Sequence, residues 1–269
     1  MKKCILLLVF ALTSAKLISQ NAELNYDNNS NYFSLHIGTP QQSGPDLTVE
    51  GFYTSQHHVG SPGGDWNVNY RVYNMGQGMT SPESTVKIFA SRHNDLTSDA
   101  VLLTQTNIPT LQVGRYYDAT SFIHIPSGFS NGSYIYLIAV VDPDNLINEL
   151  NKNNNSRSIC IHIGTPNQNG ADLTVEDLTS TQHHVGSPGG DWNITYRIYN
   201  MGQGTSSESA IAKIYISREN QLTNSAVFLT QVTIPAILVG KYYDATSFIH
   251  IPSGFAQGSY LNIFVTVNK

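Results

Sequence analysis

Two adjacent histidines are the residues whose chemistry is easiest to name in this chain. His57 and His58 stand in the segment QHHVGSPGGDWN, which also holds Asp65, and the segment recurs with His183 and His184. Imidazole and carboxylate groups ligate zinc, but a zinc site usually draws three or four ligands from several elements. Adjacent strand residues point to opposite faces of a sheet. The sequence therefore predicts a loop or interface role for these histidines and no metal site.

A second group of oxygen ligands lies in the segment VDPDNLINEL. Asp142, Asp144 and Glu149 carry the type of carboxylate that binds calcium. Aspartate, asparagine and proline are also the residues that build turns between strands. We expect a solvated turn here.

Catalytic signatures are absent from the sequence. It contains no G-x-S-x-G elbow, no H-E-x-x-H pair and no phosphate-binding loop. Cys160 is surrounded by strand-forming residues that offer no positioned base, so we expect a small buried side chain rather than a nucleophile. We expect no enzymatic activity and no cofactor.

Aromatic residues offer a different chemistry, because their rings can stack on sugars. Trp66 lies within an alternating strand pattern and is expected to fill a core, as a buried tryptophan does in many sandwich folds. The paired tyrosines of the two YYD segments are better candidates for glycan contacts, with one of each pair expected to face solvent. These are Tyr116, Tyr117, Tyr242 and Tyr243.

Composition and charge exclude several classes of protein. Charged residues make up 12% of the 269 residues, the formal net charge is -5, and no Lys/Arg block is present. The basic footprint of a nucleic-acid-binding protein is therefore missing. An apolar content of 40% is enough for packed cores.

The N-terminus has the pattern of a secretory signal. Lys2 and Lys3 precede a short apolar run at 5–12, which is followed by small residues. We expect residues 1–22 to be a signal peptide and the protein to be secreted or displayed at the cell surface. No later segment is long and apolar enough to predict a membrane span.

An internal repeat with a constant period of 126 residues organises the rest of the chain. Roughly 60 of 96 positions are identical when 46–141 is aligned with 172–267, without a gap. Alternation of apolar and polar residues predicts strands rather than helices. The expected strands of the first copy are 46–50, 66–73, 84–91, 100–107, 116–125, 133–141 and 157–163. Seven short strands separated by turn signals predict an all-β fold of two tandem immunoglobulin- or fibronectin-III-like β-sandwich domains.

These segments, taken in order, resemble the CARDB family, a cell-adhesion-related bacterial module. The shared marks are the opening PDL, the N-x-G after the second strand, an S…D segment, IP…G-x-Y and the closing VD…NEL…NN. The resemblance implies an immunoglobulin-like sandwich without catalytic residues and a scaffold or adhesion role. The second copy departs from the pattern at Ala171 and Ser225, and it stops at Lys269 before the closing segment.

A strand without a domain stands at the other end of the chain. Residues 23–40 match 149–166, which contain the expected final strand of the first sandwich. The sequence thus predicts an N-terminal strand at 23–40, a sandwich at 45–163, and a sandwich at 171–269 that lacks its own final strand. Phe33, Leu35 and Ile37 would fill a core.

Three placements of this strand are open. It packs on the first domain, which we favour, or it folds back onto the second domain of the same chain. Alternatively, residues 31–37 complete the second domain of a neighbouring molecule, so that the chains assemble head-to-tail.

Two functions follow from this reading. The first is a structural or adhesion protein of the cell exterior whose partners are other copies of itself, surface proteins or glycans. The alternative is a secreted carbohydrate-binding module.

Overall fold

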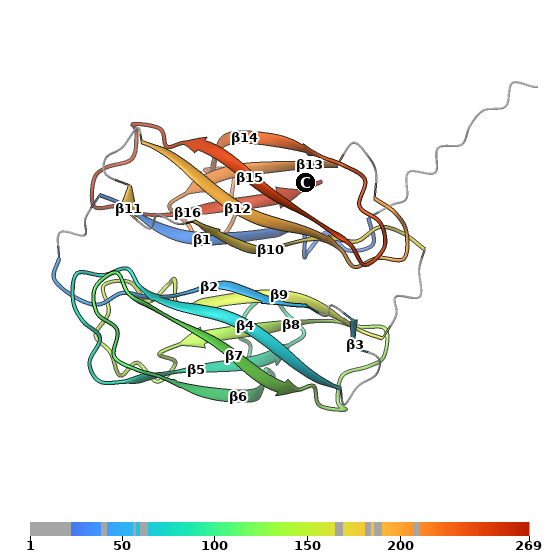
Figure 1. The fold of residues 1–269 in the computed structure, drawn as a ribbon, viewed down its shortest axis with the longest axis horizontal. Coiled ribbons are helices and arrows are strands. Elements are labelled where there is room, and N and C mark those ends of the chain that lie inside the picture. The colour runs from blue at the N-terminus through green and yellow to red at the C-terminus, as the bar shows by residue number, and fades with distance from the viewer. Residues whose placement is uncertain are drawn as a thin grey trace, which may run out of the picture.

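The chain folds into two β-sandwiches that lie side by side in a computed structural model (Figure 1). The structure describes residues 23–38, 42–55, 64–164, 169–180, 190–206 and 210–268, and the backbone of 58–59 and 184–185. All described regular elements are strands: β1 (Ser30–Ile37), β2 (Leu47–Thr54), β3 (His58–Val59), β4 (Asp65–Asn74), β5 (Ser84–Ser91), β6 (Val101–Ile108), β7 (Tyr116–His124), β8 (Tyr134–Val141), β9 (Ser156–Ile163), β10 (Leu173–Ser180), β11 (His184–Val185), β12 (Asp191–Asn200), β13 (Ala210–Ser217), β14 (Val227–Ile234), β15 (Tyr242–His250) and β16 (Tyr260–Val267). The described residues include no helix with the length and apolarity that crossing a bilayer requires.

The two sandwiches share one topology. Domain 1 pairs a sheet of order β2-β4-β7 with one of order β3-β9-β8-β5-β6. Domain 2 pairs β10-β12-β15 with β11-β1-β16-β13-β14. Each strand of domain 2 lies 126 residues after its counterpart in domain 1, except that β1 takes the place that β9 holds in domain 1. The predicted all-β sandwich fold and the strands of the first copy are confirmed.

Alternating side chains explain why these segments form half-buried strands. Along β4, the residues Trp66, Val68, Tyr70 and Val72 are buried, while their neighbours are exposed or only partly buried. Trp66 lies in the core of domain 1, as the sequence predicts. Period-two burial of this kind is what a sheet with one core-facing side requires.

The NMGQG turn after β4 depends on glycine because two backbone segments meet there. A Cβ atom on Gly76 would lie 2.3 Å from the carbonyl oxygen of Gly44 and 2.6 Å from the amide nitrogen of Asp46. Gly202 is crowded in the same way by Gly170 and Asp172. The repeated motif therefore holds the start of each domain against the end of its second long strand.

Strand β1 belongs to domain 2 of its own chain. It pairs antiparallel with β16, from Ser30 opposite Thr266 to His36 opposite Tyr260, and parallel with β11. In Figure 1 the blue β1 lies among the orange and red strands of domain 2. Our favoured placement, in which this strand packs on domain 1, is wrong.

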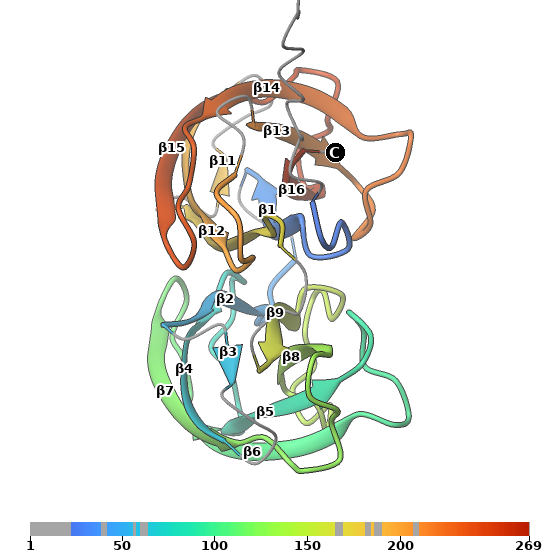
Figure 2. The same cartoon turned by 90° about the vertical axis from the view of Figure 1, so that its right-hand side faces the viewer.

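The side-by-side packing of the domains explains this placement. Strands β2 and β10 lie against each other (Figure 2). The position that β1 occupies in domain 2, beside β16, is therefore close to the start of domain 1. Residues 38–46 connect β1 to β2, and nine extended residues span up to about 30 Å. The strand therefore does not have to pass along the length of domain 1.

Candidate functional site

Buried polar contacts fix the segment that leads into β1. The segment before β1 is anchored to domain 2 by three side chains. Asn28 Nδ2 donates to Asp172 Oδ1 at 2.8 Å, and Asn29 Nδ2 donates to the carbonyl of Val267 at 3.0 Å. Glu23 Oε1 accepts the amide of Leu173 at 2.5 Å.

The same anchors repeat in domain 1, where they precede β9. Asn154 Nδ2 donates to Asp46 Oδ1 at 2.8 Å, and Asn155 Nδ2 donates to the carbonyl of Val141 at 3.2 Å. Glu149 Oε2 accepts the amide of Leu47 at 2.6 Å. The repeated NEL…NN pattern is therefore a clasp that fixes the final strand of each sandwich.

Contacts across the junction are related by an approximate two-fold axis. Arg157 Nη1 lies 3.4 Å from Asn31 Oδ1, and these two residues hold equivalent positions in β9 and β1. Tyr134 of domain 1 donates to Asp172 Oδ2 of domain 2 at 2.5 Å. Its counterpart Tyr260 lies beside Asp46 and interacts with it electrostatically, although the pair does not form an aligned hydrogen bond. Such an arrangement is that of a symmetric dimer interface formed within one chain.

Burial raises the pKa values of the carboxyl groups in the two clasps. It raises the pKa of Glu23 and of Glu149 to about 7, against hydrogen bonds that lower it. It raises the pKa of Asp46 to about 6 and that of Asp172 in the same direction. Loss of water around a carboxylate favours its neutral form, which is the cause in all four cases.

The difference between the two tyrosine–aspartate pairs gives a matched test. We expect Tyr134→Phe to lower the free energy of unfolding by about 1–3 kcal/mol, because it leaves a buried acceptor without its donor. Tyr260→Phe should cost less, since no aligned hydrogen bond is lost. Urea unfolding of both variants measures this, and equal losses would contradict the assigned asymmetry.

An apolar cluster surrounds the Tyr134 contact. Tyr136, Ile138 and Cys160 lie on the outer face of domain 1 and are buried together with Met201 of domain 2. Burial raises the pKa of the Cys160 thiol well above its ordinary value. The thiol is therefore a packing residue, as the sequence predicts.

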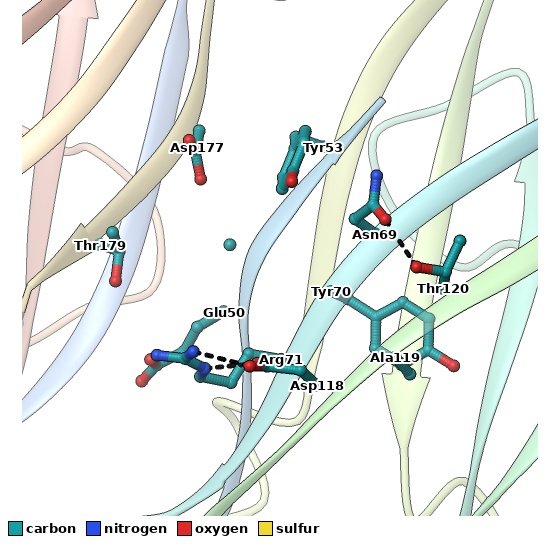
Figure 3. Close-up of a pocket in the computed structure, with 11 residues that line it drawn as sticks. Glu50, Tyr53, Asn69, Tyr70, Arg71, Asp118, Ala119, Thr120, Asp177 and Thr179 are labelled. Atoms are coloured by element: carbon teal, nitrogen blue, oxygen red, sulfur yellow. Dashed lines mark hydrogen bonds and ion pairs between the residues drawn. The ribbon is translucent and has the colours of Figure 1, made fainter. Parts of the chain in front are cut away.

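A polar groove of about 430 Å³ takes walls from both domains (Figure 3). Domain 2 contributes Asp177 and Thr179 from β10. Domain 1 contributes the remaining residues from β2, β4 and β7: Glu50, Gly51, Tyr53, Asn69, Tyr70, Arg71, Asp118, Ala119 and Thr120.

Two interactions between β4 and β7 form the domain 1 wall. Arg71 binds Asp118 with both ends of its guanidinium, at 2.6 and 2.9 Å. Thr120 donates to Asn69 Oδ1 at 2.7 Å, which leaves the Asn69 amide nitrogen facing the groove side of the sheet. This wall carries both hydrogen-bond donors and acceptors.

Asp177 is the unusual residue of the groove. It has a left-handed backbone with φ of 48°, a conformation that costs energy for a residue with a Cβ atom. Its counterpart in domain 1 is Gly51, with φ of 51°. Within the described part of the chain its carboxylate has no hydrogen bond or ion pair, and burial raises its pKa. A strained position that places an unpaired carboxylate in a groove is a candidate for binding.

Gly51 leaves room for that carboxylate. A Cβ atom on Gly51 would lie 3.8 Å from Asp177 Oδ1. If both positions held an aspartate, the two negatively charged carboxylates would lie close together and repel each other. The divergence of the copies at 51–55 is therefore the sequence signal that marks the groove, and sequence analysis alone did not connect it to a site.

The paired tyrosines lie outside the groove. Tyr116 and Tyr242 are 52% and 53% exposed, whereas Tyr117 and Tyr243 pack against the cores, so one of each pair faces out as expected. The Arg71 guanidinium covers the Tyr116 ring at 3.7 Å from its centroid. One ring face of this glycan candidate is thus already occupied, and Arg197 covers Tyr242 in the same way.

The histidine candidates of the sequence fall largely outside the part of the chain that the structure describes. His57, His183 and the side chains of His58 and His184 lie outside the described residues, as do residues 1–22. Asp65 pairs with His124 at 2.6 Å.

The three carboxylates of the VDPDNLINEL segment have separate partners. Asp142 accepts the amides of Leu146 and Ile147, Asp144 binds Lys87, and Glu149 belongs to the clasp. They hold the turn that the sequence predicts, but Asp142 is buried rather than solvated. No group of three or more metal-ligating side chains occurs among the residues that the structure describes.

Comparisons with known proteins point to one family. The CARDB family profile matches residues 44–159, which is domain 1 from the turn before β2 into β9. No curated protein matches the chain.

Two solved domains are similar to part of this chain. A CARDB domain of Pyrococcus furiosus, solved in complex with di-metal ions, is 22% identical, with a TM-score of 0.35; the match covers 46% of this chain and 91% of that one. A domain from a Methanosarcina acetivorans protein assigned to the cell surface is 17% identical, with a TM-score of 0.34, covering 44% and 91%.

The family profile covers the first sandwich, and the second sandwich repeats its sequence and strand order. A CARDB domain indicates an adhesion-type protein related to the cell surface. Domain 1 is a CARDB domain, as its sequence motifs indicated.

Proposed function

We propose that this protein is a secreted adhesion module of the cell exterior that binds a carbohydrate in the groove between its two domains. The observation that carries the proposal is the set of polar groups in the groove that make no hydrogen bond within the described part of the chain. These are the carboxylate of Asp177 and the hydroxyls of Tyr53 and Thr179.

Sugar hydroxyls both donate and accept hydrogen bonds, and the groove offers both partners. The Asp177 carboxylate accepts, the Asn69 amide nitrogen donates, and the hydroxyls of Tyr53 and Thr179 do either. A volume of about 430 Å³ lies within the range of small-molecule sites, which is roughly 300–1,000 Å³. The Tyr53 ring adds an apolar surface on which a sugar ring can stack.

Removal of the Asp177 carboxylate tests the site. Asp177→Gly copies the residue at the equivalent Gly51 and relieves the left-handed strain. We expect unchanged or higher stability, because glycine adopts this conformation freely. We also expect glycan affinity to fall about 10- to 100-fold, the effect of losing a charged hydrogen bond. The measurement is a glycan array with the mature protein, followed by calorimetric titration of the bound glycan.

Tyr242→Ala is the control, since Tyr242 and the Arg197 that covers it are not among the residues that line the groove. Loss of binding in this variant, with binding retained in Asp177→Gly, would move the site to the paired tyrosines. A mature protein that binds no glycan on the array would leave the structural and adhesive role without a carbohydrate ligand.

A further inference from the structure

A second groove lies between the two domains, apart from the groove that holds Asp177. It has a volume of about 510 Å³, and the two grooves share no lining residue among those that the structure describes. The first residues of β1 and β9 form its base, and exposed residues of the turns at 94–96 and 220–222 form its rims. Every lining residue of one domain has its counterpart, 126 positions away, in the lining of the other. The groove therefore lies on the approximate two-fold axis of the junction.

The two halves of this groove differ in charge at one position of the base. Strand β9 has Arg157 where β1 has Asn31. Asn31 Nδ2 donates to the carbonyl of Val175 in β10 at 3.1 Å. Arg157 donates from Nε and Nη2 to the equivalent carbonyl of Val49 in β2, both at 3.3 Å. A neutral asparagine is thus sufficient for this structural contact, and the positive charge of Arg157 is not required for it.

The guanidinium of Arg157 is a buried cation. The residue is 6% exposed, and burial lowers the pKa of Arg157. Its other contacts are Asn31 Oδ1, 3.4 Å from Nη1, and the ring of Tyr32, whose centre lies 5.0 Å from the guanidinium carbon. Glu50 acts on the guanidinium electrostatically, but no carboxylate of the described residues forms a hydrogen bond or ion pair with it. Because a buried charge is costly unless it is paired, an anion in the groove stabilises this arrangement.

The guanidinium keeps hydrogen-bond donors for such an anion. One N–H of Nη1 and one N–H of Nη2 are not used by Asn31 and Val49. Two donors on one planar group match the two oxygens of a carboxylate. Around them, the amides of Asn94 and Asn220 lie one on each rim. Amide groups bind the hydroxyls of a sugar ring, because they both donate and accept hydrogen bonds.

We propose that this groove binds the carboxylate group of an acidic sugar, which is held by the guanidinium of Arg157. The ligand supplies the negative charge that Arg157 lacks, and the rim amides bind its hydroxyl groups. Among the described lining residues Asp95 is the only acidic one, and it lies on an exposed rim where water and salt screen its charge. The groove therefore selects uronic acids over neutral sugars of the same size. This proposal does not depend on the groove that holds Asp177.

Titration calorimetry of the mature protein with trigalacturonate tests the site. We expect trigalacturonate to bind at least about 10-fold more tightly than the neutral galactose trisaccharide, as one charged hydrogen-bonded contact predicts. Arg157→Asn copies the residue at the equivalent position of β1, so its urea midpoint should stay close to that of the parent. Its affinity for trigalacturonate should fall about 10- to 100-fold, to that of the neutral sugar. Equal affinities of Arg157→Asn and the parent, or no binding by the parent, overturn the proposal.

Two further variants separate the site from an effect of overall charge. Arg115→Asn removes the same charge from an exposed turn outside the groove, and it should bind like the parent. Arg157→Lys keeps the charge but not the paired donors, and its affinity should lie between those of the parent and Arg157→Asn. A glutamate tripeptide is the comparison for ligand class. If it binds as tightly as trigalacturonate, the assignment to a sugar is wrong.

Asp95→Gln tests the site without altering its base. Gln221 holds the equivalent place on the opposite rim, and position 95 is exposed, so the fold should not change. We expect the affinity for trigalacturonate to rise about 2- to 5-fold at low salt, because a repelling charge is removed. The gain should shrink at about 0.5 M salt, where the repulsion is screened. An affinity that does not change at low salt would show that the acid binds outside this groove.

Discussion

Loss of the N-terminal strand is expected to unfold the domain at the opposite end of the sequence. Leu35→Asp places a carboxylate in the core of domain 2, where Leu35 is fully buried. Burial of Phe33, Leu35 and Ile37 contributes on the order of 1.5–3 kcal/mol per side chain. An unpaired buried charge adds several kcal/mol of cost. The sum approaches the total stability of a typical domain, about 5–15 kcal/mol.

The repeat offers a matched control for this prediction. Ile161 is the counterpart of Leu35 in β9 and is fully buried in the core of domain 1. Hydrogen exchange read by mass spectrometry should show loss of protection in β13 and β16 for Leu35→Asp. Ile161→Asp should instead expose β5 and β8. Loss of protection in β5 and β8 of the Leu35 variant would contradict the placement of β1.

A second large effect is expected from pH. Glu23 and Glu149 have folded pKa values of about 7, well above the ordinary glutamate value. Between pH 4.5 and 7 the folded protein holds protons that the unfolded chain has released. Stability from these groups is therefore fully present below pH 4.5 and is lost as pH rises through 7. At 1.36 kcal/mol per pKa unit, each glutamate accounts for on the order of 3 kcal/mol.

The two buried aspartates act in the same direction. The pKa of Asp46 is raised to about 6 and that of Asp172 is also raised. We expect the urea midpoint to be higher at pH 5 than at pH 8. The combined Glu23→Gln and Glu149→Gln variant should flatten this difference, since glutamine keeps the shape without the titration. Equal midpoints at pH 5 and pH 8 in the parent protein would show that hydrogen bonding outweighs burial at the clasps.

At low pH, the loss of exposed ion pairs lowers the stability that the buried carboxyl groups would otherwise add. The Arg71 guanidinium holds the pKa of Asp118 below its ordinary value. The stability from this pair is present above the unfolded pKa and is lost as pH falls through the folded value. The optimum of stability is therefore expected at about pH 4, below the ordinary pKa of glutamate and above the pH at which this ion pair is lost.

The sequence was sufficient to predict the strands and the core, because both depend on local alternation. Trp66 and the isoleucines of β9 alternate with polar residues, and that pattern fixes which face is buried. The exact partner of β1 was not predictable in this way. Its core-facing residues suit either domain, so the choice depends on how the domains pack.

The sequence of β1 did not reveal that packing, because the residues on its outer face are polar. From Phe33 onward β1 is buried on both faces, and its outer face carries Ser34 and His36. A strand covered on both sides indicates a neighbour beyond its own sandwich. The groove was missed for a related reason, since Asp177 and Tyr53 are brought together only by the contact between the two domains.

Because the first strand pairs with the last, domain 2 can complete its fold only after domain 1. Residues of β1 and β16 that face each other are more than 220 positions apart, as Ser30 and Thr266 show. Domain 1 has all its strands once β9 has left the ribosome. Strand β1 must then wait, with its apolar face uncovered, until the last strand of the chain arrives. Non-local closure of this kind is slow, and a chain that is cut short inside domain 2 leaves β1 exposed to chaperones and proteases. The apolar face of β1 is therefore covered only in chains in which synthesis of domain 2 has been completed.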